Sequence, residues 1–255
     1  LRVVASDVDT DALGTFAGEI PRTLTMGEAA MAKARLGMQR AGLGLGLGSE
    51  GTIGPDPVTG MLICDVELIA FVDDEQGLVI TEVVRSFEIT AVSQAVSVDD
   101  PLDALLTRAN FPSHRLIVRP EGVSVRELQL ELLVKGLDDF QQLQDAIRNC
   151  AQASPSHQAR VESDFRAHCS PSRQRIIQRC AQTLAERINR RCPNCQMPGW
   201  GQIDLLRGLP CAGCGSWVAR ARRGAVLGCV CCEFSLVVGD ERIAEDPARC
   251  DICNP

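Results

Sequence analysis

Residues 192–214 read CPNCQMPGWGQIDLLRGLPCAGC, and residues 229–253 read CVCCEFSLVVGDERIAEDPARCDIC. These two stretches contain four pairs of cysteines, each in Cys-x-x-Cys spacing. Two intervening residues let both sulfurs of a tight turn reach one ion at about 2.3 Å, and two such turns complete a tetrahedral shell of four thiolates. The sequence therefore predicts two structural zinc ions, with no coordination position left for a reacting water. The predicted ligands are Cys192, Cys195, Cys211, Cys214, Cys229, Cys232, Cys250 and Cys253.

The spacing between pairs leaves open which two pairs share an ion. The first and second pairs are separated by 15 residues, and the third and fourth by 17, so consecutive pairing fits zinc-ribbon spacing and is favoured. The second and third pairs, 14 residues apart, fit nearly as well. Cys231 lies inside the third pair and could substitute for a neighbour, although the two-residue spacing favours Cys229 and Cys232.

The distribution of cysteines indicates metal binding in a reducing compartment. Nine of the 13 cysteines fall within residues 192–255. The alternative is that some of these pairs are disulfides or free thiols. The other four are scattered along the chain and are predicted to be packed thiols; they are Cys64, Cys150, Cys169 and Cys180.

Length and composition favour two domains. The 255-residue chain is 45% apolar, enough for one sizeable core and a small satellite. We predict an α/β domain over residues 1–190 and a zinc-ribbon domain over residues 191–255. The opening LRVVA is typical of an interior strand, so we expect the natural start of the chain to lie upstream. The apolar stretches are shorter than the roughly 20 residues of a membrane-spanning helix, and no leader precedes them. We therefore predict a cytoplasmic protein without a membrane partner.

Upstream of the cysteines, helices and strands interleave, which is typical of an α/β fold with a mixed sheet flanked by helices. Thr25 and Glu28 form a capping-box pattern before a helix at 26–40. Leucine then alternates with glycine from residue 43, which predicts a strand over 43–57 whose bare positions admit another backbone or a ligand. The remaining predictions are a hairpin of strands 62–72 and 78–89, a strand at 115–118, and helices at 137–151 and 170–190.

The N-terminal segment distantly resembles the inosine triphosphate pyrophosphatase superfamily, which includes the Maf-type families. The resemblance rests on Thr25, the helix motif AMAKA at 30–34, and a glycine-rich strand that ends at Glu50. It implies that Lys33 faces a triphosphate, that Glu50 binds catalytic magnesium or manganese, and that water splits a nucleoside triphosphate. Two features depart from the superfamily: Ser49 stands where a second acid is usual, and the first strand with its phosphate loop is absent.

Over its whole length the chain resembles an uncharacterised bacterial family that is known only as a domain of unknown function. That resemblance rests on the combination of DTDALGTFAGEIPR, SEGTIGPDP, FPSHRLIVRP, VESDFRAH and the closing CDICNP. It implies no activity.

A second candidate site lies in the segment ARVESDFRAH, residues 159–168. Strand alternation would place its four polar residues on one face: Glu162, Asp164, Arg166 and His168. Such a row could hold a divalent ion on its two acids, a phosphate on the arginine, and a general acid or base on the histidine. An exposed edge strand protected by charge is the alternative.

Three further residues are weaker candidates. His114 could join the charged row, although a lone loop histidine is more often only hydrogen-bonded. Asp65 and Glu67 could bind a metal from one face of a strand, and solvent-facing hairpin positions would explain them equally well.

Two functions compete. The first is a magnesium- or manganese-dependent hydrolase acting on a nucleotide or another small phosphate ester. The second is a non-enzymatic zinc ribbon that binds a protein or nucleic acid. Nucleic acid is the less favoured partner because the net charge is −7 and residues 192–255 carry six arginines against seven acids.

Overall fold

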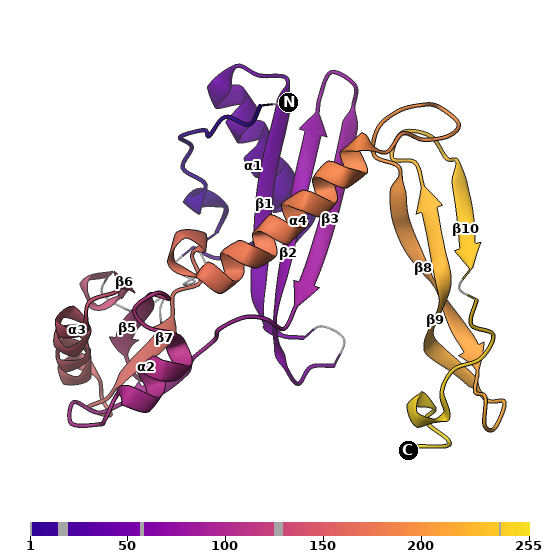
Figure 1. Ribbon diagram of the computed structural model, residues 1–255. Helices are drawn as coiled ribbons and strands as arrows, with labels where there is room; N and C mark the ends of the chain where they lie inside the picture. Colours follow the sequence, from indigo (N-terminus) through magenta and orange to yellow (C-terminus); the bar gives the residue numbers. More distant parts are fainter. Residues whose placement is uncertain (1, 15–19, 57–58, 125–129, 240) are drawn as a thin grey trace. The chain divides into compact units, whose positions relative to one another are not determined.

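The computed structural model describes residues 2–14, 20–56, 59–124, 130–239 and 241–255. Parts of two motifs, residues 15–19 of DTDALGTFAGEIPR and residue 57 at the end of SEGTIGPDP, lie outside the described residues. Helices and antiparallel sheets alternate along the chain (Figure 1), which confirms the predicted α/β class. The chain divides into two compact units. Unit 1 comprises Leu1–Asp73 and Thr81–Gln182, and unit 2 comprises Asp74–Ile80 and Thr183–Pro255.

The first sheet of unit 1 has the order β1-β2-β3. Its strands are β1 (Leu45–Pro55), β2 (Ile63–Asp73) and β3 (Leu78–Ser86), and the predicted hairpin is formed by β2 and β3. Helix α1 (Met26–Ala41) begins at the predicted capping box: the Thr25 hydroxyl accepts from the Glu28 N–H, and the Glu28 carboxylate accepts from the Thr25 N–H. These reciprocal bonds satisfy two helix donors that would otherwise lack a partner.

Helix α1 lies unusually close to β1 because glycines face it. A Cβ on Gly48 would lie 2.0 Å from the carbonyl oxygen of Ala30, and one on Gly46 would lie 2.6 Å from Cγ of Met38. Ala30 and Ala34 are fully buried in this contact. The predicted close approach at the bare positions of the strand is therefore confirmed, and the element that approaches is a helix.

We expect Gly48→Ala to lower the free energy of unfolding of unit 1 by about 1–3 kcal/mol, because the added methyl collides with helix backbone. Gly54→Ala in the same strand is the control, since a Cβ there meets no atom within 4 Å and the change should stay below about 0.5 kcal/mol. Denaturant unfolding followed by the helical circular-dichroism signal measures both. Equal stability of the two variants would contradict the close approach.

A second sheet in unit 1 has the order β4-β7-β5-β6. Its elements are β4 (Ser93–Val96), α2 (Asp103–Ala109), β5 (Leu116–Pro120), β6 (Val134–Leu137), α3 (Phe140–Ala153) and β7 (Ala159–Ser163). The buried face of α3 contributes Leu143 and Ile147 to a core with Leu116 and Val161. The predicted helix start at residue 137 is wrong. Residues 134–137 form β6, and α3 begins only after Asp139, whose carboxylate caps it by accepting from the Gln142 N–H.

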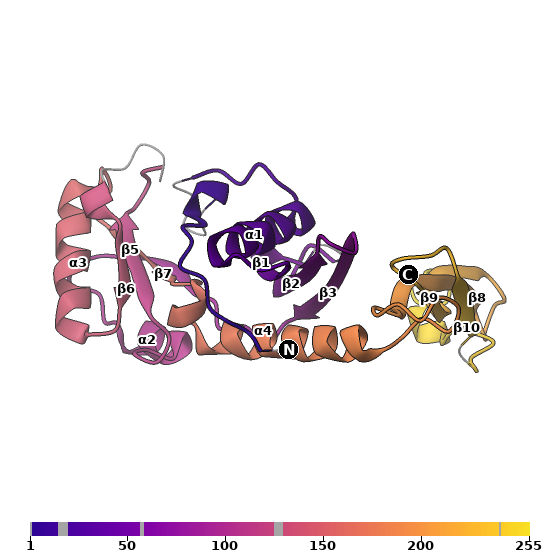
Figure 2. The same cartoon turned by 90° about the horizontal axis from the view of Figure 1, so that it is seen from above.

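Helix α4 (Pro171–Asn189) agrees with the prediction for residues 170–190. It lies on the face of the β1-β2-β3 sheet opposite α1 (Figure 2). The Cys180 thiol on α4 contacts the carbonyl oxygens of Glu67 on β2 and Glu82 on β3. None of the helices in the described part of the chain combines the length and apolarity needed to cross a bilayer.

Unit 2 contains a sheet with the order β10-β9-β8. Its antiparallel strands are β8 (Gly201–Pro210), β9 (Trp217–Gly228) and β10 (Ser235–Gly239). A small buried cluster in this unit contains two cysteines beside Leu209, Val218 and Ala221. Short 3-10 helices complete the chain: η1 (Asp11–Leu13), η2 (Leu130–Leu132), η3 (Ala167–Cys169) and η4 (Pro247–Arg249).

Candidate metal centres

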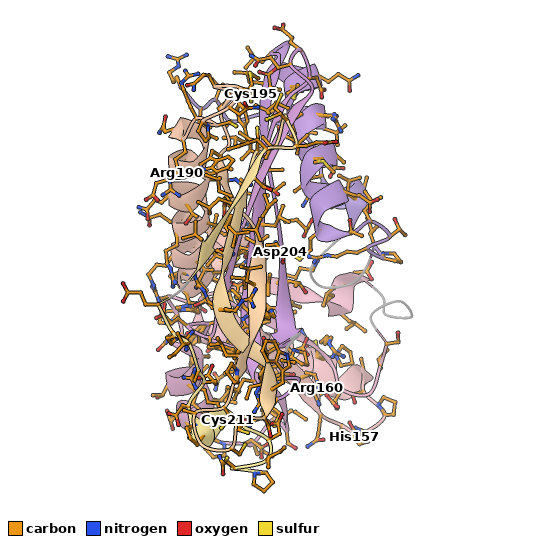
Figure 3. The ribbon with its side chains drawn as sticks, turned by 90° about the vertical axis from the view of Figure 1, so that its right-hand side faces the viewer. His157, Arg160, Arg190, Cys195, Asp204 and Cys211 are labelled. Carbon is orange, nitrogen blue, oxygen red and sulfur yellow. The ribbon has the colours of Figure 1, made fainter. Side chains whose placement is uncertain are left out.

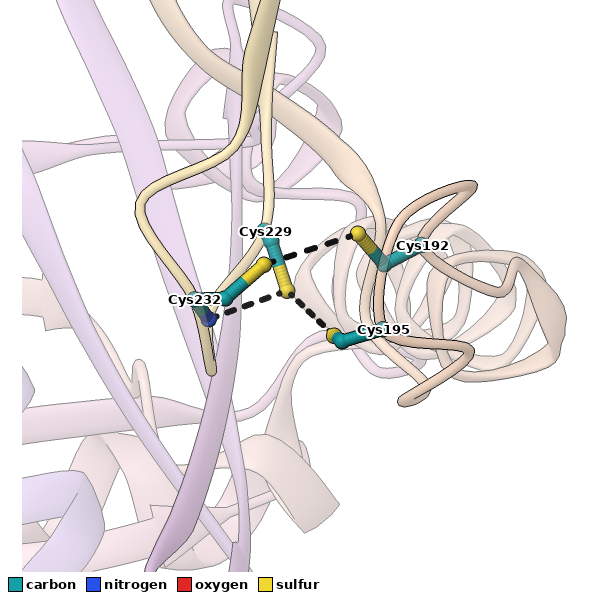
Figure 4. A group of neighbouring side chains, drawn as sticks. All are labelled: Cys192, Cys195, Cys229 and Cys232. Atoms are coloured by element: carbon teal, nitrogen blue, oxygen red, sulfur yellow. Dashed lines mark hydrogen bonds between the residues drawn. The ribbon is translucent and has the colours of Figure 1, made fainter.

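The eight predicted cysteines converge in two groups of four in unit 2. In each group the four Sγ atoms all lie within 4.8 Å of one another. Site I is formed by Cys192, Cys195, Cys229 and Cys232 (Figure 4). Site II is formed by Cys211, Cys214, Cys250 and Cys253.

The sulfur separations fit a tetrahedral metal shell. In site I the Sγ atoms of Cys192 and Cys232 are 3.8 Å apart, and those of Cys195 and Cys229 are 3.5 Å apart. Both corresponding separations in site II are 3.7 Å. A tetrahedron with metal–sulfur bonds of about 2.3 Å separates its sulfurs by about 3.8 Å, whereas a disulfide requires about 2.05 Å. The two groups can therefore hold one metal ion each, and none of the described cysteines forms a disulfide.

The cysteine pairs are interleaved, so both predicted pairings are wrong. The first pair meets the third, and the second meets the fourth. The cause is the antiparallel register of β8 and β9, in which Gly201 lies opposite Gly228 and Pro210 opposite Trp217. Pairs that precede β8 and follow β9 therefore meet at one end of the sheet. In Figure 3, Cys195 and Cys211 lie at opposite ends of this sheet, with Asp204 between them.

The first two turns share one backbone geometry. In site I the Gln196 N–H donates to the Cys192 carbonyl and the Cys192 N–H to the Met197 carbonyl, at 2.9 and 2.8 Å. In site II the corresponding bonds join Cys211 to Gly215 and Ser216 at the same distances. The residue after each second cysteine has positive φ, 62° for Gln196 and 75° for Gly215. This conformation closes the turn and directs two sulfurs to one point.

Nearby hydrogen bonds stabilise one thiolate in each site. The N–H groups of Cys231 and Cys232 donate to Sγ of Cys229 at 3.2 and 3.3 Å. Desolvation opposes ionisation, yet these bonds lower the pKa of Cys229 to about 7. The Ser216 side chain and backbone lower the pKa of Cys214 to about 6. The Cys231 thiol is exposed and lies outside both groups.

The implied site at Lys33 and Glu50 is a compact ion-pair cluster. Glu50 is buried and faces α1, and its carboxylate lies 2.8 Å from Nζ of Lys33 and 3.4 Å from Nη1 of Arg22. Arg22 also donates to the Gly51 carbonyl at 2.7 Å. Two cations thus surround one carboxylate, and a metal ion at Glu50 would have to displace them.

The predicted charged row at 159–168 is not a continuous strand face, which corrects that expectation. Strand β7 ends at Ser163, and the Asp164 carboxylate accepts from the Arg166 N–H two residues on, a local turn that replaces strand pairing. Glu162 pairs with Arg119 at 3.2 Å, whereas buried Asp164 pairs with Arg166 at 2.6 Å. His168 is exposed in η3. Desolvation opposes ionisation of Asp164, but the Arg166 hydrogen bonds keep its pKa low.

The two candidate catalytic groups are not brought together by any direct polar contact. Among the described residues, no hydrogen bond or ion pair joins Lys33 or Glu50 to the 162–168 segment. Lys33 lies on α1 and Glu50 on β1, whereas the 162–168 segment begins in β7, a strand of the second sheet, and continues beyond it.

The weaker candidates are buried. His114 accepts from the Ser172 N–H at 3.1 Å through Nε2, and desolvation together with the charge of Arg175 lowers its pKa. Asp65 and Glu67 are both fully buried, so the solvent-facing alternative is wrong. Their burial could not be read from alternation, because a strand covered on both faces carries no polar face. The four scattered cysteines, Cys64, Cys150, Cys169 and Cys180, are buried as predicted.

A comparison with known protein families identifies the family of the chain. Residues 33–255 match the family described as Domain of unknown function (DUF6671), a span that includes both cysteine groups. The chain belongs to this family. The match confirms the resemblance to an uncharacterised family, whereas nothing in it supports the likeness to the Maf-type superfamily. Neither the curated proteins nor the solved structures include a match to the chain.

Interleaved pairing predicts the metal content of double variants. Cys195→Ser/Cys229→Ser removes two ligands from site I alone and should retain one ion per chain. Consecutive pairing, or pairing of the second pair with the third, would place these residues in different sites, and the variant would retain none. Cys231→Ser is the control and should retain two ions. Elemental analysis of purified protein measures all three, and complete metal loss in the double variant would contradict the interleaving.

Proposed function

We propose that the C-terminal unit of this family is a zinc-binding module, in which two structural zinc ions fasten the two ends of the β8–β10 sheet. The observation that carries this proposal is the convergence of eight sulfurs into two groups with separations of 3.5–3.8 Å. A tetrahedral shell of four thiolates suits zinc, and iron is the other metal that such a shell accepts. Because four protein ligands close each shell, the ions have a structural role.

The small buried cluster of the β8–β10 sheet supports this role. It consists of three aliphatic residues and two cysteines, Cys211 and Cys250. Small units rarely bury enough apolar surface to offset chain entropy and commonly use metals instead. Structural zinc contributes about 10–16 kcal/mol in zinc-finger peptides, which is comparable to the whole stability of a typical domain.

Metal removal should unfold unit 2 before unit 1. Both tryptophans of the chain lie in unit 2, and the Trp200 ring stacks on Phe234 at 5.7 Å beside site I. A chelator of zinc should shift tryptophan emission to the red and abolish protection from hydrogen exchange in β8 and β9. Peptides from α3 and β7 should keep their protection, and re-added zinc should restore both signals. Unchanged emission in metal-free protein would contradict the structural role.

We further propose that the zinc module binds a protein and not nucleic acid. Its apolar side chains include exposed Trp217, Ile203 and Val237, whereas the six arginines of residues 192–255 are balanced by seven acids. Aromatic and aliphatic side chains are typical of protein interfaces, and phosphate binding requires a basic footprint that this unit lacks.

A second candidate function is hydrolysis of a phosphate ester at Lys33 and Glu50. The observation that favours it is the convergence of Lys33 and Arg22 on one buried carboxylate, that of Glu50. Lys33 and Arg22 can bind a phosphate group with their positive charges. If they leave Glu50 to do so, the Glu50 carboxylate becomes available to bind magnesium or manganese. Zinc has no part in this reaction.

Glu50→Gln tests the hydrolase. We expect phosphate or pyrophosphate release from nucleoside triphosphates, with magnesium or manganese, to fall at least about 100-fold, as is typical when a catalytic group is lost. Glu75→Gln in the exposed turn before β3 is the charge-matched control and should keep full activity. Circular dichroism must show that both variants fold. Absence of release from any nucleotide by the unaltered protein, or equal release by Glu50→Gln, would remove this candidate.

A further inference from the structure

A buried carboxylate pair lies between β2 and α4 in unit 1. Asp65 and Glu67 are two residues apart on β2, so their side chains emerge on the same face of the sheet. Both are 0% exposed. Gly51 on β1 lies directly opposite Glu67, and a Cβ there would come within 2.4 Å of Oε2 of Glu67. The glycine therefore leaves the space that the Glu67 carboxylate occupies.

One arginine serves Glu67. Nε of Arg173 donates to Oε1 of Glu67 at 2.5 Å, and Nη2 donates to Oε2 at 3.3 Å. The remaining guanidinium nitrogen, Nη1, donates to the Phe165 carbonyl at 2.6 Å. This two-point contact fixes the guanidinium of α4 on β2 and neutralises one of the two carboxylates.

Asp65 has no such partner. Neither of its carboxylate oxygens, both fully buried, has a hydrogen-bond partner among the described residues. An ionised and unpaired carboxylate in this position would destabilise the folded chain, and buried polar groups almost always have partners. Burial, followed by the charge of Glu67, raises the pKa of Asp65 to about 8.

Among the described residues, the elements around the pair supply no second cation to Asp65. The charged residues of β3, the other neighbour of β2, are Glu82 and Arg85, and Arg85 pairs with Asp56 at 3.0 Å. The residues opposite the pair on β1 are Gly51 and Ile53, which carry no charge. Helix α4 contributes Arg173 and the neutral Cys180 thiol, and Cys64 on β2 points to the other face of the sheet. Glu67 and Arg173 are the charged groups that act on Asp65. Two carboxylates therefore face one guanidinium, and one positive charge is missing.

We propose that Asp65 and Glu67 bind this missing charge as a proton, shared between them as a hydrogen-bonded acid and carboxylate. The Asp65 hydroxyl then donates to the Glu67 carboxylate, which also accepts from Arg173. The proton satisfies Asp65 and makes the contact between α4 and β2 electrically neutral. A divalent cation fits less well, because it needs about six oxygen ligands and the pair offers only two carboxylates beside a guanidinium.

The bound proton makes the stability of unit 1 depend on pH with a definite sign. The pKa of Asp65 is raised in the folded chain from 3.8 to about 8. The stabilisation by the proton is therefore complete below pH 4 and is lost as the pH rises through 8. Relative to Asp65→Asn, which cannot ionise, the unfolding constant of the unaltered protein should rise by up to about tenfold per pH unit between pH 5 and 7.

The test compares the unaltered full chain with Asp65→Asn and with the control Asp99→Asn, an exposed acid. Because both tryptophans lie in unit 2, hydrogen exchange of peptides from β2 and α4 reports on the relevant region. We expect Asp65→Asn to remove the pH dependence of protection between pH 5 and 8, and Asp99→Asn to leave it intact. An identical pH dependence in all three proteins would overturn the proposal.

Infrared spectroscopy gives an independent readout that needs no stable variant. At pH 6 the unaltered protein should show the carbonyl band of a buried protonated carboxylic acid, and this band should disappear near pH 8. Absence of the band at pH 6 would overturn the proposal. Stabilisation by magnesium, sodium or potassium at fixed pH, in the unaltered protein but not in Asp65→Asn, would also overturn it by identifying the bound charge as a metal cation.

Discussion

The antiparallel pairing of β8 with β9 is the constraint on which the whole of unit 2 depends. It places the cysteine pair before β8 beside the pair after β9, at one end of the sheet. The pair between β8 and β9 lies at the other end, where it meets the final pair, which follows β10. Neither group of four exists without this register, and the buried cluster between the strands that could hold it is small. Strand pairing and metal binding therefore form one cooperative unit, in which each makes the other possible.

Local patterns were readable from the sequence, and long-range ones were not. The capping box at Thr25, the glycines that face α1 and the Cys-x-x-Cys turns are set by residues within a few positions of one another. The partner of each cysteine turn depended on strand register, which turn spacing alone does not fix. The prediction of one charged strand face at 159–168 is wrong for a related reason, because the Asp164 side chain accepts a hydrogen bond from the Arg166 N–H and the strand ends at Ser163. The burial of Asp65 could not be predicted, because a strand that is covered on both faces shows no alternation of polar and apolar residues.

The acids of unit 1 show why a short motif is weak support for a catalytic site. Glu50, Glu162 and Asp164 each lie against an arginine or lysine at 2.6–3.4 Å. Such pairs are what a buried carboxylate needs merely to remain charged in a folded chain. A motif that contains a lysine and an acid at suitable spacing is therefore expected in many folds without a bound phosphate. Asp65 differs from these acids because its chemistry is not explained by a neighbouring cation.

The interleaving of the cysteine pairs also constrains how the protein is made. With consecutive pairing, a nascent chain could complete its first metal site once Cys214 had left the ribosome. In the arrangement observed here, site I waits for Cys232 and site II for Cys253. Four reduced thiols therefore remain without their partners while β9 is synthesised, available to any competing metal or oxidant. The cell that makes this protein must keep these thiols reduced, or occupied by a weakly held metal, until Cys253 has been synthesised.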